Sequence, residues 1–189
     1  LELSPKHIWV IAQRAQMYGQ LGQYDEALSD ILEVLEPNKA EDNDDSVLYL
    51  ALANVETMQG KYSEAAVDYY QWITLNQKRI QAYTISDSNK QVDLPIRLGW
   101  VYSIKFNGVS GQRLKIVAKG KENEAIDPIL VILDPTNDPV VASDDIVMFE
   151  DLDSSIDDYK LPTTGTYTIL VSQSVSGISG DVSVSLELK

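Results

Sequence analysis

The sequence predicts a multidomain chain of the α + all-β class, in which antiparallel helical hairpins precede an antiparallel β-sandwich. Two observations predict this division. Apolar residues recur at spacings of three and four between residues 8 and 76, which is the period of amphipathic helices. Between residues 92 and 189 they alternate with polar residues, which is the period of half-buried strands. We therefore expect a helical domain over 1–76, a linker or capping helix over 77–91, and a sandwich over 92–189.

The helical part contains an internal repeat. The segments LGQYDEAL at 21–28 and QGKYSEAA at 59–66 share one pattern and lie 38 residues apart. Gly22 and Gly60 interrupt the amphipathic stretches on either side of them, so each unit is a helix, a glycine turn and a second helix. We expect helices over 8–21, 24–36, 47–59 and 62–75.

This unit resembles the tetratricopeptide repeat, a 34-residue helical hairpin with Gly at its turn, Tyr two residues later and Ala three further on. Both units carry all three residues, namely Gly22, Tyr24, Ala27, Gly60, Tyr62 and Ala65. The segment LELSPK at 1–6 matches the end of a preceding repeat, so we expect an array truncated at its N-terminus. Arg14 and Trp72 depart from the apolar and alanine positions of the family, which predicts different local packing.

The resemblance implies a surface for a protein or peptide partner. In the repeat family the first helix of each pair lines a concave surface that binds extended peptides or partner helices. The matching positions here are Trp9, Ala12, Gln16, Gln20, Leu50, Asn54 and Thr57. The alternative is that these residues cover the next repeat or the sandwich. Trp72, in the aromatic stripe 69–75, is expected to be an interdomain residue on which the sandwich docks.

Strand patterns fill the second half. Tyr102, Ile104 and Phe106 alternate with polar residues, and the segment 114–118 continues the same period. Turn signals at 107–108, 110–111, 134–138 and 163–165 separate further strands over 128–133, 138–143, 165–173 and 181–188. Seven or eight short strands over 98 residues favour an antiparallel sandwich.

This half resembles the bacterial pre-peptidase C-terminal domain, a jelly-roll-like β-sandwich found as an accessory module in secreted peptidases and other exported bacterial proteins. The resemblance covers residues 92–189. The segments on which the resemblance rests are the strand 102–106 followed by SGQ at 110–112, then DPILVILDP at 127–135, VASDD at 141–145 and LPTTGTYTILV at 161–171.

Composition excludes several classes of function. Acidic residues outnumber basic ones 29 to 15, and the net charge of -14 repels nucleic acid and anionic lipid. With no cysteine and a single histidine, His7, thiolate and most imidazole chemistry is missing. No stretch approaches the roughly 20 apolar residues of a membrane-spanning helix, and the N-terminus lacks a signal-peptide pattern. We expect no catalytic residue, no nucleic-acid partner and no membrane insertion.

An acidic run begins at the end of the segment VASDD. It holds seven carboxylates in fifteen residues, namely Asp144, Asp145, Glu150, Asp151, Asp153, Asp157 and Asp158. Calcium prefers such oxygen ligands, although no EF-hand spacing is present. The candidate calcium ligands are Asp144, Asp145, Glu150, Asp151 and Asp153, with the first two favoured. The alternative is a solvated acidic loop and no cofactor.

Together these features predict a non-catalytic protein–protein interaction or scaffold fragment of a larger, exported bacterial protein. We expect it outside the cell or in the cell envelope, with the cytoplasm as the alternative. An accessory targeting or secretion-associated module of an upstream peptidase is the second functional hypothesis. A carbohydrate-binding module is the third, and it requires exposed aromatic side chains on the sandwich.

Overall fold

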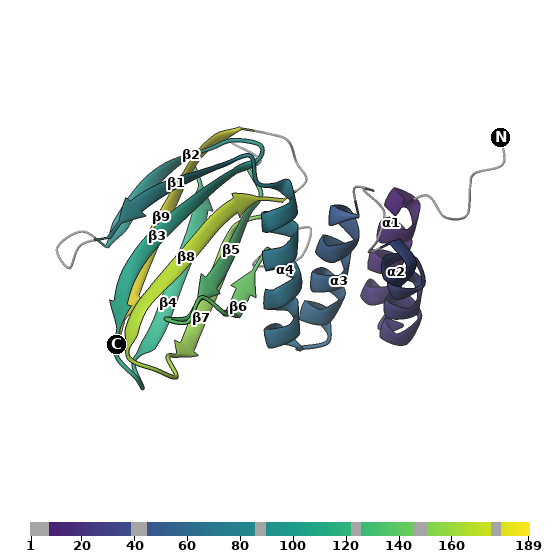
Figure 1. The fold of residues 1–189 in the computed structure, drawn as a ribbon, viewed down its shortest axis with the longest axis horizontal. Coiled ribbons are helices and arrows are strands. Elements are labelled where there is room, and N and C mark those ends of the chain that lie inside the picture. The colour runs from purple at the N-terminus through teal and green to yellow at the C-terminus, as the bar shows by residue number, and fades with distance from the viewer. Residues whose placement is uncertain (1–7, 39–44, 86–89, 122–125, 146–150, 175–178) are drawn as a thin grey trace. The chain divides into compact units, whose positions relative to one another are not determined.

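The computed structural model describes residues 8–38, 45–85, 90–121, 126–145, 151–174 and 179–189 (Figure 1). The chain divides into two compact units, Leu1–Leu75 and Asn76–Lys189. In the described residues the first unit is helical and the second consists of strands, so the predicted α + β composition is confirmed. No helix within the described ranges is long and apolar enough to cross a membrane.

Within the described residues, the first unit contains four helices: α1 (Ile8–Gln20), α2 (Tyr24–Asn38), α3 (Ser46–Met58) and α4 (Tyr62–Asn76). Each lies within two residues of its predicted bounds. Their buried faces follow the predicted spacing, since Ala15, Ala27 and Ile31 are completely buried.

The two glycine turns have the same geometry. Gly22 has φ 74° and Gly60 has φ 78°, values that L side chains rarely adopt. In both turns the residue after the glycine donates its N–H to the carbonyl five positions earlier, at 2.9 Å. This bond satisfies a carbonyl that the preceding helix leaves open. The 38-residue sequence repeat is therefore a repeat of backbone structure as well.

Small and charged residues set the packing around α1. A Cβ added to Gly19 would lie 2.9 Å from Sδ of Met58, so glycine allows α1 to approach α3 closely. Arg14, which departs from the apolar pattern, instead forms a two-bond ion pair with Asp30 of α2, at 2.5 Å and 2.9 Å. Its charge thus connects the two helices at their exposed edge.

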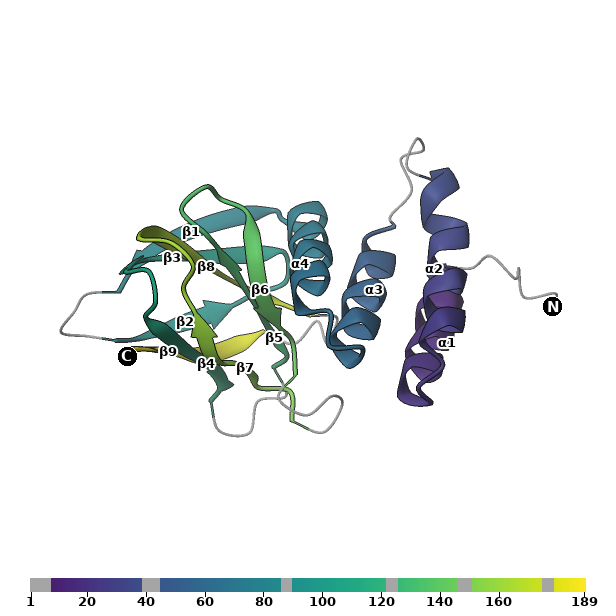
Figure 2. The same cartoon turned by 90° about the horizontal axis from the view of Figure 1, so that it is seen from below.

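The described part of the second unit contains nine strands: β1 (Arg79–Thr84), β2 (Gln91–Ile96), β3 (Trp100–Gly108), β4 (Arg113–Gly120), β5 (Pro128–Leu133), β6 (Pro139–Ser143), β7 (Ser154–Lys160), β8 (Gly165–Gln173) and β9 (Gly180–Leu188). They make a five-stranded sheet in the order β1-β3-β8-β5-β6 and a four-stranded sheet in the order β2-β9-β4-β7. Figure 2 shows the two sheets as stacked layers of a β-sandwich.

The core lies between these layers. The alternating residues that predict β3 and β4 all belong to it, namely Tyr102, Ile104, Phe106, Leu114, Ile116 and Ala118. Strand β5 is buried along its whole length, which explains its uninterrupted apolar sequence PILVIL.

Three strands, β1, β2 and β7, are not among those predicted individually, and β2 lies at the start of the predicted sandwich. Strand β1 lies inside the predicted linker 77–91, which is neither a plain linker nor a helix, and it pairs in parallel with β3. Tyr83 packs against the core beside Tyr102, whereas Ile80 is exposed, so the strand has little apolar alternation of its own. Strand β7 lies inside the acidic run. Its inward Ile156 is buried, and β4 supplies Lys115 as a partner for Asp157 at 2.6 Å.

Candidate functional site

Three aspartates converge at one end of the five-stranded sheet. One carboxylate oxygen from each of Asp127, Asp144 and Asp145 lies within 4.8 Å of the other two. Asp144 is 5% exposed, while Asp127 and Asp145 are partly buried. We call these residues the aspartate triad. The sequence predicted Asp144 and Asp145 as candidate ligands and missed Asp127.

The β5–β6 hairpin brings the triad together. Leu130 pairs with Ser143, so the residues that follow β6 lie beside the start of β5. Asp127 immediately precedes β5, and Asp144 and Asp145 immediately follow β6. The turn at 134–138 lies midway in the sequence between Asp127 and Asp145. In a hairpin, residues at equal distances before and after the turn lie side by side, and this spacing could have identified Asp127 as the third member of the triad.

Neighbouring strands hold the backbone of this site in place. The backbone N–H of Ser174, just after β8, donates to the carbonyl of Asp127 at 2.8 Å. Ser154, at the start of β7, is completely buried, and its hydroxyl donates to the carbonyls of Pro128 and Asp144. Both sheets therefore contribute to the position of the triad.

The electrostatics of the triad are unfavourable without a counter-charge. Burial raises the pKa of Asp144 well above its ordinary value, and the charges of Asp127 and Asp145 raise it further. Burial, followed by the charge of Asp145, raises the pKa of Asp127 to about 6. Oδ1 of Asp127 and Oδ1 of Asp144 are buried without a hydrogen-bond donor. Either protons or a cation must compensate these oxygens near neutral pH.

The other predicted ligands lie apart from the triad or outside the described residues. Oδ1 of Asp153 accepts a hydrogen bond from the N–H of Gly120 at 2.8 Å, and its Oδ2 lies 3.6 Å from Nζ of Lys119. Asp151 is exposed and accepts from the N–H of Asp153 at 3.2 Å. Glu150 falls outside the described residues. The acidic run is therefore divided, with part of it paired to lysines of β4.

The predicted partner-binding residues differ in accessibility. Trp9 is 49% exposed, Gln20 is exposed, and Gln16 and Thr57 are partly exposed. The remaining three are buried, namely Ala12, Leu50 and Asn54. Part of the predicted surface is therefore accessible, and its other members are packed inside the helical unit.

Asn54 has a visible structural role among those buried residues. Its Oδ1 accepts a hydrogen bond from the hydroxyl of Tyr69 at 2.5 Å, which joins α3 to α4. Trp72 is 7% exposed, and its predicted interdomain role stays a prediction. His7 lies outside the described residues.

The aromatic side chains of the sandwich point mainly into its core. Tyr102 and Tyr167 are completely buried and Phe106 is 6% exposed. Phe106 and Tyr167 stack with ring centroids 5.4 Å apart. Among the described residues of the sandwich, the exposed large apolar side chains are all aliphatic. Tyr83, Trp100 and Tyr159 are partly buried, so few aromatic rings in the described part of the sandwich are accessible to a sugar.

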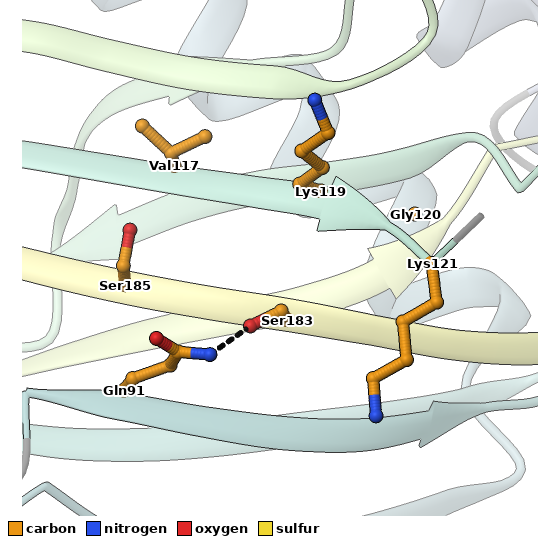
Figure 3. Close-up of a pocket in the computed structure, with 7 residues that line it drawn as sticks. All are labelled: Gln91, Val117, Lys119, Gly120, Lys121, Ser183 and Ser185. Carbon is orange, nitrogen blue, oxygen red and sulfur yellow. Dashed lines mark hydrogen bonds between the residues drawn. The ribbon is translucent and has the colours of Figure 1, made fainter.

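A shallow depression crosses the outer face of β2, β9 and β4 (Figure 3). Its lining is Gln91, Val117, Lys119, Gly120, Lys121, Ser183 and Ser185. Lys121 lies 2.9 Å from Asp93, and Lys119 lies 3.6 Å from Asp153, so neither ammonium group is left to attract an anion. The depression presents mainly hydroxyl and aliphatic groups.

Comparison with solved structures gave matches of low sequence identity that cover somewhat more than half of this chain. The pre-peptidase C-terminal domain of a collagenase from Bacillus anthracis is 12% identical with a TM-score of 0.42, over 57% of this chain and 94% of that one. The surface-associated copper-binding protein CorA of Methylomicrobium album BG8 is 10% identical with a TM-score of 0.48, over 58% and 98%. PliG, a periplasmic inhibitor of g-type lysozyme from Aeromonas hydrophila, is 13% identical with a TM-score of 0.38, over 58% and 98%. No family model matches the sequence, and a search of curated proteins gave no match.

Proposed function

We propose that the chain is a non-catalytic protein-binding fragment of an exported bacterial protein. Its helices act as tetratricopeptide-like repeats that bind a protein or peptide, and its sandwich is an accessory domain of the pre-peptidase C-terminal type. The observation that carries this proposal is the pair of equivalent glycine turns, because the same sequence pattern builds the same backbone twice. Export is supported by the resemblance of residues 92–189 to modules of exported proteins.

The binding surface of this proposal centres on α1. Trp9 offers a large apolar side chain, and Gln16 and Gln20 follow at helical spacing with amide donors and acceptors. An accessible aromatic side chain beside amides suits recognition of an extended peptide by packing and hydrogen bonding.

The test is selection of peptides from a random displayed library on the purified chain, followed by affinity measurement on variants. We expect Trp9→Ala to weaken the selected peptides at least about tenfold, the scale of losing an interface anchor. Tyr62→Ala is the matched control, since Tyr62 is an exposed aromatic residue, 57% exposed, outside the predicted surface. If the selected peptides bind Trp9→Ala and Tyr62→Ala with the same affinity as the unchanged chain, Trp9 is not part of the binding site.

We also propose that the aspartate triad binds calcium and stabilises the sandwich. The supporting observation is the two buried oxygens, Oδ1 of Asp127 and Oδ1 of Asp144, which have no hydrogen-bond donor. Calcium takes six to eight oxygen ligands at 2.3–2.6 Å, and its two positive charges would offset two of the three negative charges of the triad. Its role here is structural, because it would offset the repulsion that folding creates.

Isothermal titration of the chelator-dialysed chain with CaCl₂ tests this second proposal. We expect heat from one site in the unchanged chain and none after Asp127→Asn. Asp151→Asn is the matched control, because Asp151 is an exposed aspartate outside the triad. Equal calcium binding by all three proteins would mean that the triad is not the site.

An accessory role in an upstream peptidase remains the alternative for the sandwich. The buried aromatic rings of β3 and β8 give a carbohydrate-binding role less support. Mass spectrometry of cell and culture-fluid fractions distinguishes the accessory role in a peptidase from a role as a scaffold. Peptides of this chain in the culture fluid, joined to a peptidase region, would support the accessory role, and a cytosolic protein made of further repeats would support an intracellular scaffold.

A further inference from the structure

A cationic corner lies at the end of the sandwich where β1 and β3 begin. The guanidinium carbon of Arg79 lies 4.6 Å from the ring centroid of Trp100, and that of Arg97 lies 5.2 Å from it. Lys78 lies next to this turn, because a Cβ added to Gly99 would lie 2.9 Å from Cδ of the Lys78 side chain. Two guanidinium groups therefore lie over one indole ring, and a lysine side chain packs against the neighbouring glycine.

The backbone fixes this arrangement. The N–H groups of Lys78 and Arg79 both donate to the carbonyl of Gly99, at 2.7 Å and 3.3 Å. The N–H of Trp100 donates to the carbonyl of Arg97 at 2.9 Å, which closes the turn 97–100. The indole in turn stacks on Tyr102, with centroids 6.2 Å apart. The cations are thus attached to a rigid part of the sandwich rather than to a loose loop.

The charges of this corner have no counter-charge in the described chain. Six other basic residues form ion pairs, namely Arg14, Arg113, Lys115, Lys119, Lys121 and Lys189. Across the described residues, no carboxylate lies within 4.0 Å of the charged nitrogens of Lys78, Arg79 or Arg97. This is unexpected in a chain of net charge -14, where carboxylates are abundant. An anion from outside the chain would satisfy the corner.

The chemistry of the corner favours carboxylates. A guanidinium that lies over an indole face keeps the N–H groups at its edge free, and these match a carboxylate with two parallel hydrogen bonds. Leu98, which is 58% exposed in the same turn, adds an apolar contact beside the charges. This combination of neighbouring cations and an exposed aliphatic side chain fits a peptide better than a small inorganic anion.

Strand β1 supplies the second recognition element. It lies at the edge of the five-stranded sheet and pairs on one side only, with β3. Its outer edge therefore offers backbone donors and acceptors for an added strand. Because Arg79 is the first residue of β1, a strand added to this edge would run directly past the cationic corner.

We propose that this corner and the free edge of β1 bind an acidic peptide in extended conformation. Carboxylates of the peptide pair with Lys78, Arg79 and Arg97, and its backbone bonds to the outer edge of β1. This site belongs to the sandwich alone and is independent of the helical partner surface and of the aspartate triad.

The probe is a fluorescent eight-residue peptide of alternating Glu and Val, followed by anisotropy with the full chain. We expect binding that weakens with added salt and falls about tenfold with Arg97→Gln, the scale of losing one charge-assisted contact. Lys160→Gln is the matched control, because Lys160 is exposed and has no ion pair within 4.0 Å in the described residues. Equal losses in the two variants would overturn the proposal, since binding would then follow net charge alone.

Two further measurements separate strand addition from simple charge attraction. The same peptide with methylated nitrogens at alternate residues keeps its carboxylates but loses backbone donors along one edge. We expect the methylated peptide to bind at least about tenfold more weakly than the unmodified peptide. Hydrogen exchange of the β1 amides should slow only with the unmodified peptide. Undiminished binding of the methylated peptide, or a sulfated heparin octasaccharide that binds more tightly than the peptide, would overturn the assignment. Unchanged melting of Arg97→Gln excludes loss of fold.

Discussion

The hydroxyl of Tyr69 donates to Oδ1 of Asn54 at 2.5 Å, and both side chains are buried between α3 and α4. This bond explains why an amide occupies a position that the repeat pattern assigned to partner contact. Burial excludes water, so the amide oxygen depends on protein donors, and Tyr69 provides one.

Tyr69→Phe should therefore destabilise the helical unit. The change keeps the ring but leaves Oδ1 of Asn54 without this donor, and such a loss costs about 1–3 kcal/mol. Chemical denaturation followed by helical circular dichroism measures it. Tyr62→Phe, at an exposed position, is the control and should leave the curve unchanged. Equal midpoints for the two variants would mean that the bond contributes nothing to stability.

The helical unit should also lose stability in mild alkali. Burial, followed by the charge of Asp68, raises the pKa of Glu56 from 4.5 to about 8. The folded state thus favours the protonated form of Glu56. The contribution of this group to the stability of the folded state is complete below pH 4.5 and is lost as the pH rises through about 8.

Helical melting temperatures measured from pH 5 to pH 9 test this expectation. The unchanged chain should melt at progressively lower temperature as the pH rises, and Glu56→Gln should flatten the profile because the amide does not ionise. Glu26→Gln, which changes an exposed acid in the first turn of α2, should retain the slope. A flat profile in the unchanged chain would show that Glu56 stays ionised throughout.

Local patterns predicted much of this fold. The alternation of Tyr102, Ile104 and Phe106 identified β3 and its inward face, because the period of a strand determines which side chains are buried. The glycine turns at 22 and 60 were equally clear, because few residues other than glycine adopt positive φ.

The features that could not be predicted from the sequence depend on contacts between segments that are far apart in the chain. Strand β1 depends on its parallel partner β3, and its exposed Ile80 gives no alternation to read. Asp127 joins the triad through the register of β5 and β6, which is a property of two segments rather than one. The cationic corner likewise assembles from two separate segments, 78–79 and 97–100, so neither Arg79 nor Arg97 stood out alone.

The aspartate triad should make the sandwich sensitive to both pH and calcium. Without a cation, burial raises the pKa of both Asp144 and Asp127, so the stability that their protonated forms contribute is lost as the pH rises, through about 6 in the case of Asp127. In chelator, the melting temperature should therefore be lower at pH 7.5 than at pH 5. Calcium at 100 times its dissociation constant should add about 2.7 kcal/mol at pH 7.5.

Asp144→Asn separates these effects. It removes one buried charge, so the chelator melt at pH 7.5 should rise while the response to calcium disappears. Asp151→Asn should behave like the unchanged chain in both respects, because Asp151 lies outside the triad. A variant Asp144→Asn that still gains stability from calcium would place the ion elsewhere.

The close contact of Gly108 with Leu161 gives a final prediction about the sandwich core. A Cβ added to Gly108 would lie 2.4 Å from Cδ1 of Leu161 and 3.1 Å from the ring of Tyr167, and all three residues are buried. Gly108→Ala should therefore cost about 1–3 kcal/mol through overpacking. Leu161→Ala alone should cost about 2–5 kcal/mol, since it opens a cavity at the same place.

The double variant is the decisive measurement. The new methyl group of Gly108→Ala would fill part of the space left by Leu161→Ala, so the combined cost should be smaller than the sum by at least about 0.5 kcal/mol. Asn107→Ala, at the exposed neighbouring position, should add its small effect independently of Leu161→Ala. Strict additivity for Gly108 as well would show that the strands move apart to accommodate the methyl group, and that glycine is not required there for close packing.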